Sequence, residues 1–160
     1  MTRPSKWNSC FFAALNKIVT GGFKSQLTSI FLNTFENSTQ LDVIVGQKPY
    51  IGGAAEAAHT FSTISGDYFK AQIWISSTVL ANASQEFVSE TIFHESIHAY
   101  LDATGTESAV VEHIAMLTGW VDCELAALQG EYNSLSLHDA LCLILGGFGD
   151  TDYLDPTMYN

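Results

Sequence analysis

The sequence is poor in positive charge. Its 160 residues include six Lys and Arg against 17 Asp and Glu, and the formal net charge is -11. Such an acidic surface repels the phosphate backbone of nucleic acids, so we expect no nucleic-acid partner. Arg3 is the only arginine, and the lysines are scattered over the first half of the chain, which gives no sign of a basic patch.

Cysteine is scarce as well. The three Cys residues stand far apart, at positions 10, 123 and 142, and no C-x-x-C occurs. This spacing disfavours a structural zinc site and a scaffold built on disulfides. Cys123 and Cys142 fall in apolar helical patterns, so we expect both to be small buried side chains.

The sequence also lacks a long uninterrupted apolar segment. The most apolar stretch, 135–148, is short and contains His138 and Asp139, which favours a buried helix over a membrane span. The apolar run 10–15 is more typical of an amphipathic helix than of a signal peptide. We therefore expect no membrane span, while the compartment stays open and includes a secreted or cell-surface origin.

What the sequence does contain is enough apolar material for one core. Hydrophobic residues make up 47% of the chain, and we expect a single domain over 1–160. Alternating and β-branched segments predict three strands, 41–45, 59–64 and 69–76, the last two forming a hairpin. Apolar periodicity predicts five helices, at about 9–19, 23–36, 84–103, 106–128 and 135–145. This order predicts an α+β fold in which a small antiparallel sheet packs on helices.

The most informative segment is His94-Glu95-Ser96-Ile97-His98, an H-E-x-x-H motif within the predicted helix 84–103. Residues i and i+4 lie on one face of a helix, so His94 and His98 can reach one metal ion. Glu95 is turned by about 100° from His94, where a carboxylate can take a proton from metal-bound water. The motif predicts a zinc site with Glu95 as catalytic base. The competing interpretation is a buried His pair bonded to backbone carbonyls.

A catalytic zinc ion usually has three protein ligands and one open position. The downstream candidates for the third ligand are Glu107, Glu112, His113 and Glu124. If Gly105 turns the next helix back antiparallel to the first, Glu112 and His113 come level with His98. Glu107 would then lie too close to the turn, and Glu124 too far along.

The apolar pattern does not decide between Glu112 and His113. We favour His113, because imidazole is the commoner partner of two His ligands. Glu112 is then the candidate for an acceptor that holds one His tautomer.

Two known zincin patterns do not fit this sequence. A metzincin has Gly and His where Leu101 and Thr104 stand, and a thermolysin-like enzyme has a Glu in the region of Thr118 and Gly119. Neither pattern therefore supplies the third ligand.

The chain instead resembles the SprT-like zincins and related small bacterial metallopeptidases, which carry H-E-x-x-H on one helix and a later His on the next. The resemblance rests on residues 94–98 and 112–116, with a hairpin just upstream. It implies a zincin-like fold and one zinc ion held by His94, His98 and His113, with Glu95 as base. The acidic charge departs from the DNA-associated members of that group.

A zinc metallopeptidase that hydrolyses a peptide or protein substrate is thus the function the sequence favours. Two alternatives stay open, namely a zinc amidase acting on a non-peptide substrate of the cell-wall type and a binding module with a degenerate site. In zincins an edge strand before the site helix pairs with extended substrate, and here 70–76 would be that strand, with Gln72 and Trp74 toward the cleft. The candidates for an oxyanion donor are Tyr100, Tyr132, Tyr153 and Tyr159.

Overall fold

The computed structural model describes residues 13–14, 32–36, 38–49, 51, 56–105 and 109–148. Most of the predicted helices 9–19 and 23–36 lies outside these residues, as does Cys10; residues 13–14, within the first of them, are helical. In chain order the elements are η1 (Leu32–Glu36, a π-helical turn), β1 (Leu41–Lys48), β2 (Ala58–Ser65), β3 (Tyr68–Ser76), α3 (Gln85–Thr104), α4 (Ala109–Gly119), α5 (Val121–Glu131) and α6 (Leu137–Gly146). The predicted α+β class is confirmed.

The sheet has three strands in the order β1-β3-β2. The predicted hairpin is confirmed: β2 pairs antiparallel with β3, and Gly66 makes the turn with a positive φ of 62°. The expectation of a purely antiparallel sheet was wrong, because β1 pairs parallel with β3. Side-chain alternation fixes which face of a strand is buried but not which neighbour it pairs with.

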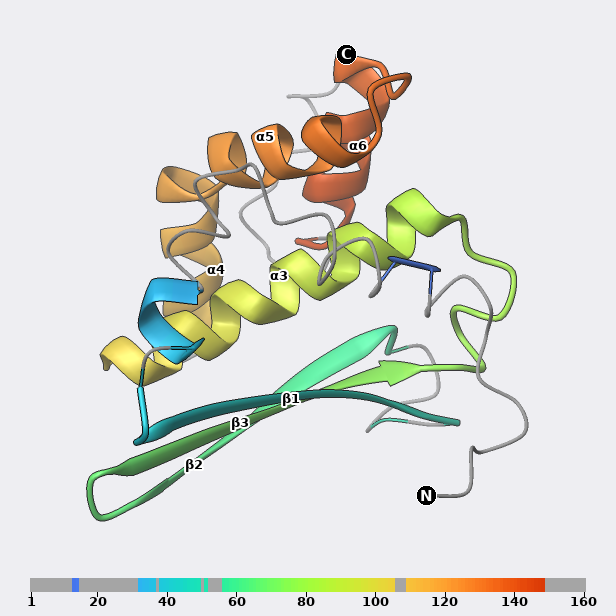
Figure 1. Ribbon diagram of the computed structural model, residues 1–160. Helices are drawn as coiled ribbons and strands as arrows, with labels where there is room; N and C mark the ends of the chain where they lie inside the picture. The colour runs from blue at the N-terminus through green and yellow to red at the C-terminus, as the bar shows by residue number, and fades with distance from the viewer. Residues whose placement is uncertain are drawn as a thin grey trace.

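The long helix α3 covers one face of this sheet (Figure 1). Alternate residues of β3 are buried, namely Phe69, Ala71, Ile73 and Ile75, and these face the helix. Trp74 therefore lies on the opposite face, where the Lys48 Nζ sits 3.8 Å from the centre of its ring. The expectation that Gln72 and Trp74 face a cleft beside the site helix was wrong. Nor is β3 an edge strand, because it lies between β1 and β2.

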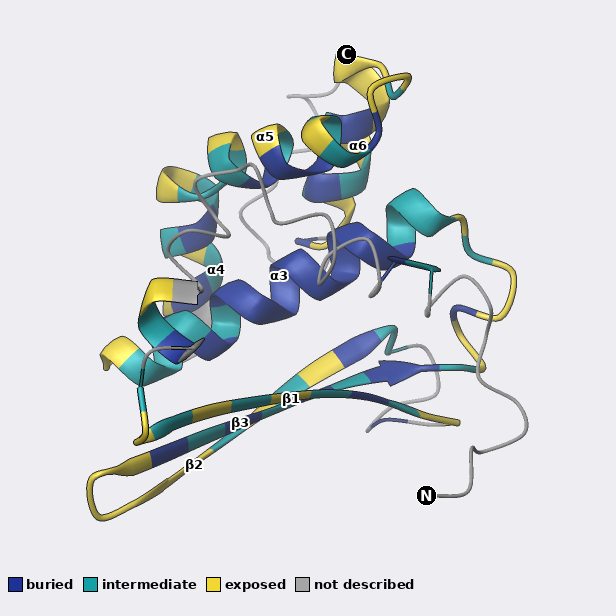
Figure 2. Ribbon diagram, viewed as in Figure 1, coloured by how far each residue is buried: buried dark blue, intermediate teal, exposed yellow. Residues whose placement is uncertain are grey.

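Helix α3 has the ends that the sequence predicts. Ser84 is its N-cap, with Oγ accepting a hydrogen bond from the N–H of Phe87, and Gly105 ends it in the left-handed conformation with φ of 92°. Most of the helix is buried (Figure 2), because the sheet lies on one side and helices α4 to α6 lie on the other. Several polar side chains of α3 are consequently enclosed in the interior.

The predicted helix 106–128 is two helices. It breaks at Gly119 and Trp120, and its second part, α5, extends past the predicted end at 128 to Glu131. Glycine is a weak helix former, and the ring of Trp120 packs on Tyr100 of α3 with 5.2 Å between ring centres. As a result α5, not α4, passes back over α3 (Figure 1).

The last helix, α6, begins two residues after the predicted start, and Ser136 is its N-cap, with Oγ accepting from the N–H of Asp139. Its Cys142 is exposed and Cys123 of α5 is partly buried, so the expectation of two buried thiols was wrong. Within the part of the chain that the structure describes, every helix is too short or too polar to span a membrane.

Candidate metal centre

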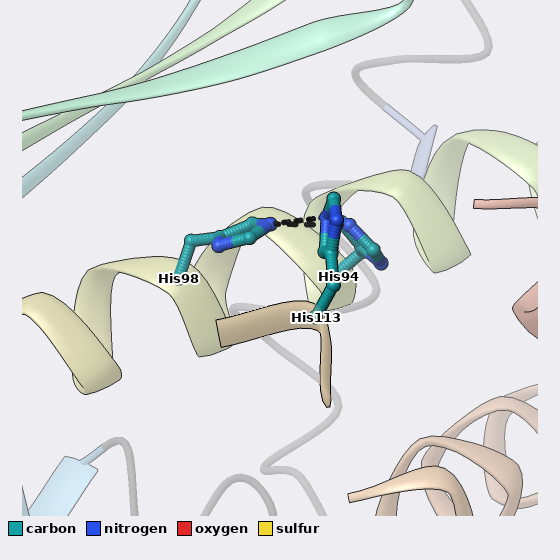
Figure 3. Close-up of side chains that lie close together, drawn as sticks. All are labelled: His94, His98 and His113. Carbon is teal, nitrogen blue, oxygen red and sulfur yellow. Dashed lines mark hydrogen bonds between the residues drawn. The ribbon is translucent and has the colours of Figure 1, made fainter. Parts of the chain in front are cut away.

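Helices α3 and α4 bring three histidine rings together. His94 and His98 stand one turn apart on α3, and His113 reaches them from α4, so that the rings point toward one another (Figure 3). Nε2 of His98 lies 3.2 Å from Nε2 of His94 and 3.1 Å from Nε2 of His113. The His94–His98 pair thus faces other imidazole nitrogens, which argues against the competing interpretation of a His pair bonded to backbone carbonyls.

The spacing of these nitrogens suits a shared metal ion. Ligand nitrogens about 2.0–2.1 Å from a tetrahedral zinc ion stand about 3.4 Å from one another, close to the distances in this cluster. His94, His98 and His113 could therefore hold a metal ion. His98 and His113 remain partly exposed to solvent.

Glu112 lies behind His98. Its Oε2 is 2.6 Å from Nδ1 of His98, and a carboxylate there accepts the N–H of that nitrogen. The tautomer that results presents a lone pair at Nε2, toward the other two rings. The structure thus brings His113 into the cluster and places Glu112 where it can orient a ligand.

Burial keeps the imidazoles of α3 neutral. Burial, together with the nearby His113, lowers the pKa of His98 to about 4. Burial and the two neighbouring histidines also hold the pKa of His94 well below its usual value. Neutral rings are the form that binds a metal, so the site is ready to accept a cation near pH 7.

Glu95 points away from the histidine face, toward the sheet. Its Oε2 accepts a 2.7 Å hydrogen bond from the hydroxyl of Thr60 on β2. Burial raises the pKa of Glu95 to about 7, while the bond from Thr60 opposes that rise. Sequence reasoning missed Thr60, because nothing in a strand pattern shows which helix residue it will meet.

Two further carboxyl groups lie near the ring of His94. Glu90, His94 and Glu124 form a second group that could hold a metal ion, and all three are buried. We had placed Glu124 too far along its helix to reach the site, which was wrong because the break after Gly119 turns α5 back over α3. Glu90 was not considered, although it precedes His94 by four residues and so shares its helix face.

The turn after α6 packs against the rings of His94 and His113. The ring of Phe148, which is fully buried, lies 5.0 Å from that of His94 and 5.5 Å from that of His113. A Cβ at Gly147 would lie 3.1 Å from Nδ1 of His94. A side chain at this position would therefore require the ring of His94 to shift by a few tenths of an ångström.

The other candidate residues lie elsewhere. Tyr100 packs on Trp120, and the hydroxyl of Tyr132 is 2.7 Å from Oγ of Ser89 in the interior. Glu107, Tyr153 and Tyr159 fall outside the described residues.

A scan against protein-family models and searches of curated proteins and of solved structures found no match to this chain. From its fold and its site alone, the chain is an α+β protein with buried His and Glu groups that could hold a metal ion.

Proposed function

We propose that this protein is a zinc-dependent metallopeptidase of the HExxH type, with one catalytic zinc ion held by His94, His98 and His113. The observation that carries the proposal is the convergence of three Nε2 atoms from two helices, with the carboxylate of Glu95 on the adjacent position of α3. Three imidazoles leave one position of a tetrahedral ion free, as hydrolytic zinc sites require. The donor set of three nitrogens also favours zinc over calcium or magnesium, which prefer oxygen.

A bound zinc ion would supply a water of lowered pKa, near ~7, and would polarise the carbonyl group of the substrate. Glu95 then acts as general base, taking a proton from the attacking water and passing it to the leaving amine. The hydroxyl of Thr60 holds Oε2 of Glu95, and Oε1 is the oxygen that would take the proton. Glu112 keeps the ring of His98 in the required tautomer.

The sheet supports a peptide as substrate. In the described part of the sheet, β2 pairs only with β3, and its other edge is unpaired. The same strand carries Thr60, the partner of the proposed base. An extended peptide that added to this edge would run past Glu95, a mode in which main-chain hydrogen bonds give affinity.

The test is the variant Glu95→Gln, assayed on a broad peptide library with zinc content measured in parallel. We expect the variant to bind as much zinc as the wild type and to lose hydrolysis. Glu86→Gln, in the first turn of the same helix, is the matched control and should keep full activity.

Two results would contradict the proposal. If the wild type binds no zinc when zinc is supplied, the proposed metal site does not exist. If the zinc-loaded wild type cleaves no peptide in the library, the protein is not a peptidase.

A further inference from the structure

A second group of ligand atoms shares His94 with the three-histidine cluster. It consists of a carboxylate oxygen from each of Glu90 and Glu124 and a ring nitrogen of His94, all within 4.8 Å of one another. Because Nε2 of His94 faces His98 while Nδ1 has no hydrogen-bond partner, Nδ1 is the nitrogen available to this group. Glu90 and His94 come from successive turns of α3, and Glu124 comes from α5, which passes over that helix. The three side chains are 3%, 7% and 1% exposed.

The polar atoms of this group have no hydrogen-bond partner among the described residues. These atoms are Oε1 of Glu90, Nδ1 of His94, and Oε1 and Oε2 of Glu124. Leaving a buried polar atom unpaired costs about 1–3 kcal/mol, and more for a charged group. Four such atoms gathered in one place indicate that something other than the surrounding side chains satisfies them.

Gly147 packs closely against two members of this group. A Cβ at that position would lie 3.1 Å from Nδ1 of His94 and 3.4 Å from Oε1 of Glu90. Ligand atoms about 2.0–2.2 Å from a zinc ion stand about 3–4 Å from one another. The group therefore has roughly the dimensions of a small cation site.

We propose that Glu90, Glu124 and Nδ1 of His94 bind a second divalent cation, so that the imidazole of His94 bridges two ions. Two carboxylates and one imidazole nitrogen are ligands of zinc and similar transition metals. The ring of His94 releases its remaining N–H proton to solvent when both nitrogens are occupied. The resulting negative ring and the two carboxylates offset the positive charge that enters the interior.

In the metal-free protein, burial disfavours the ionised form of both carboxyl groups. Burial raises the pKa of Glu124 to about 8. Burial, together with the nearby Glu124 and Glu95, raises the pKa of Glu90 well above its usual value. A dication at the centre of the group would favour the ionised form of both carboxyls and reverse these shifts.

The experiment is to load the purified full chain with Zn²⁺, remove free ion by dialysis, and measure zinc per chain by mass spectrometry of the metal. The wild type should bind two ions. Glu124→Gln should bind one, and His98→Ala, which disrupts only the three-histidine cluster, should also bind one. Glu86→Gln should bind two.

A crystal of the zinc-loaded wild type gives a second measurement that needs no variant. Anomalous scattering at the zinc edge should show two peaks, one beside each ring nitrogen of His94. A single peak beside Nε2, with equal zinc content in the wild type and Glu124→Gln, would overturn this inference and leave the metallopeptidase proposal standing. Absence of zinc from the wild type would overturn both.

Discussion

The hydroxyl of Thr60 on β2 lies 2.7 Å from Oε2 of Glu95 and 2.9 Å from the carbonyl oxygen of the same residue on α3. One hydroxyl group of the edge strand is thus shared between the side chain and the main chain of the proposed base. The sheet therefore holds the carboxylate of Glu95 in one orientation, and any movement of β2 against α3 would disturb it.

Replacing Thr60 by Val should weaken catalysis without loss of zinc. A hydrogen bond to a charged group contributes about 1.5–3 kcal/mol, so kcat/KM should fall by roughly tenfold or more. Because the bond from Thr60 opposes the burial-induced rise in the pKa of Glu95, its loss should move the acid limb of the pH profile of kcat/KM to higher pH.

Thr60→Ser is the matched control, since it keeps the hydroxyl and should keep both the rate and the pH profile near those of the wild type. If Thr60→Val and Thr60→Ser behave alike, the hydroxyl does not position the base. Zinc content should equal that of the wild type in both variants.

Replacing Glu112 by Leu should weaken zinc binding. The variant leaves Nδ1 of His98 without the carboxylate that now lies 2.6 Å from it, and loss of such a partner typically costs 10–100-fold in metal affinity. The measurement is zinc affinity in competition with a chelator. Glu112→Gln, whose amide oxygen can still accept from that nitrogen, should lose less zinc affinity. An unchanged affinity for Glu112→Leu would show that Glu112 does not contribute to the site.

Replacing Gly147 by Ala should disturb the ring of His94. The new Cβ would lie 3.1 Å from Nδ1 and 3.3 Å from Cε1 of that ring, and overpacking of this kind costs about 1–3 kcal/mol. Gly146→Ala is the control, because a Cβ there meets nothing within 4 Å. The free energy of unfolding in urea and the zinc affinity should both be lower for Gly147→Ala than for the wild type. Both should be unchanged for Gly146→Ala. Equal behaviour of the two variants would contradict the close packing at Gly147.

The metal-free protein should lose stability as pH rises because of Glu124. Its pKa in the folded state is about 8, against a usual 4.5, so between those values the folded state binds more protons than the unfolded state. The free energy of unfolding therefore falls as pH rises through this window, by an amount on the order of a few kcal/mol. Below about pH 4.5 both states are protonated and the contribution is constant.

The measurement is urea unfolding in the presence of EDTA at pH 5 and pH 8, for the wild type and Glu124→Gln. The wild type should lose more stability between the two pH values than the variant, which has no titrating group at that position. Parallel losses would show that Glu124 does not titrate with the raised pKa of a buried carboxyl.

Local sequence signals predicted the elements that carry the site. The strands at β2 and β3, the turn at Gly66, and the start and end of α3 at Ser84 and Gly105 follow from side-chain alternation, capping and glycine conformation. These are short-range properties, because each depends on residues within a few positions of one another.

The break at Trp120 was not visible in the same way. The apolar pattern continues across Gly119, and only the packing of Trp120 on Tyr100 of another helix accompanies the change in direction. That break brings Glu124 back to His94, whereas the single straight helix predicted from the sequence would place Glu124 far from it.

The sequence by itself determined that His94, Glu95 and His98 share one helix, since the geometry of a helix turn fixes their relative positions. Only the tertiary structure decided what meets them: Thr60 at the carboxylate, Glu112 at one ring, and the turn at Gly147 over another. The physical reason is that contacts between distant segments depend on how sheet and helices pack. Packing depends on the shapes of whole faces, which no local pattern contains.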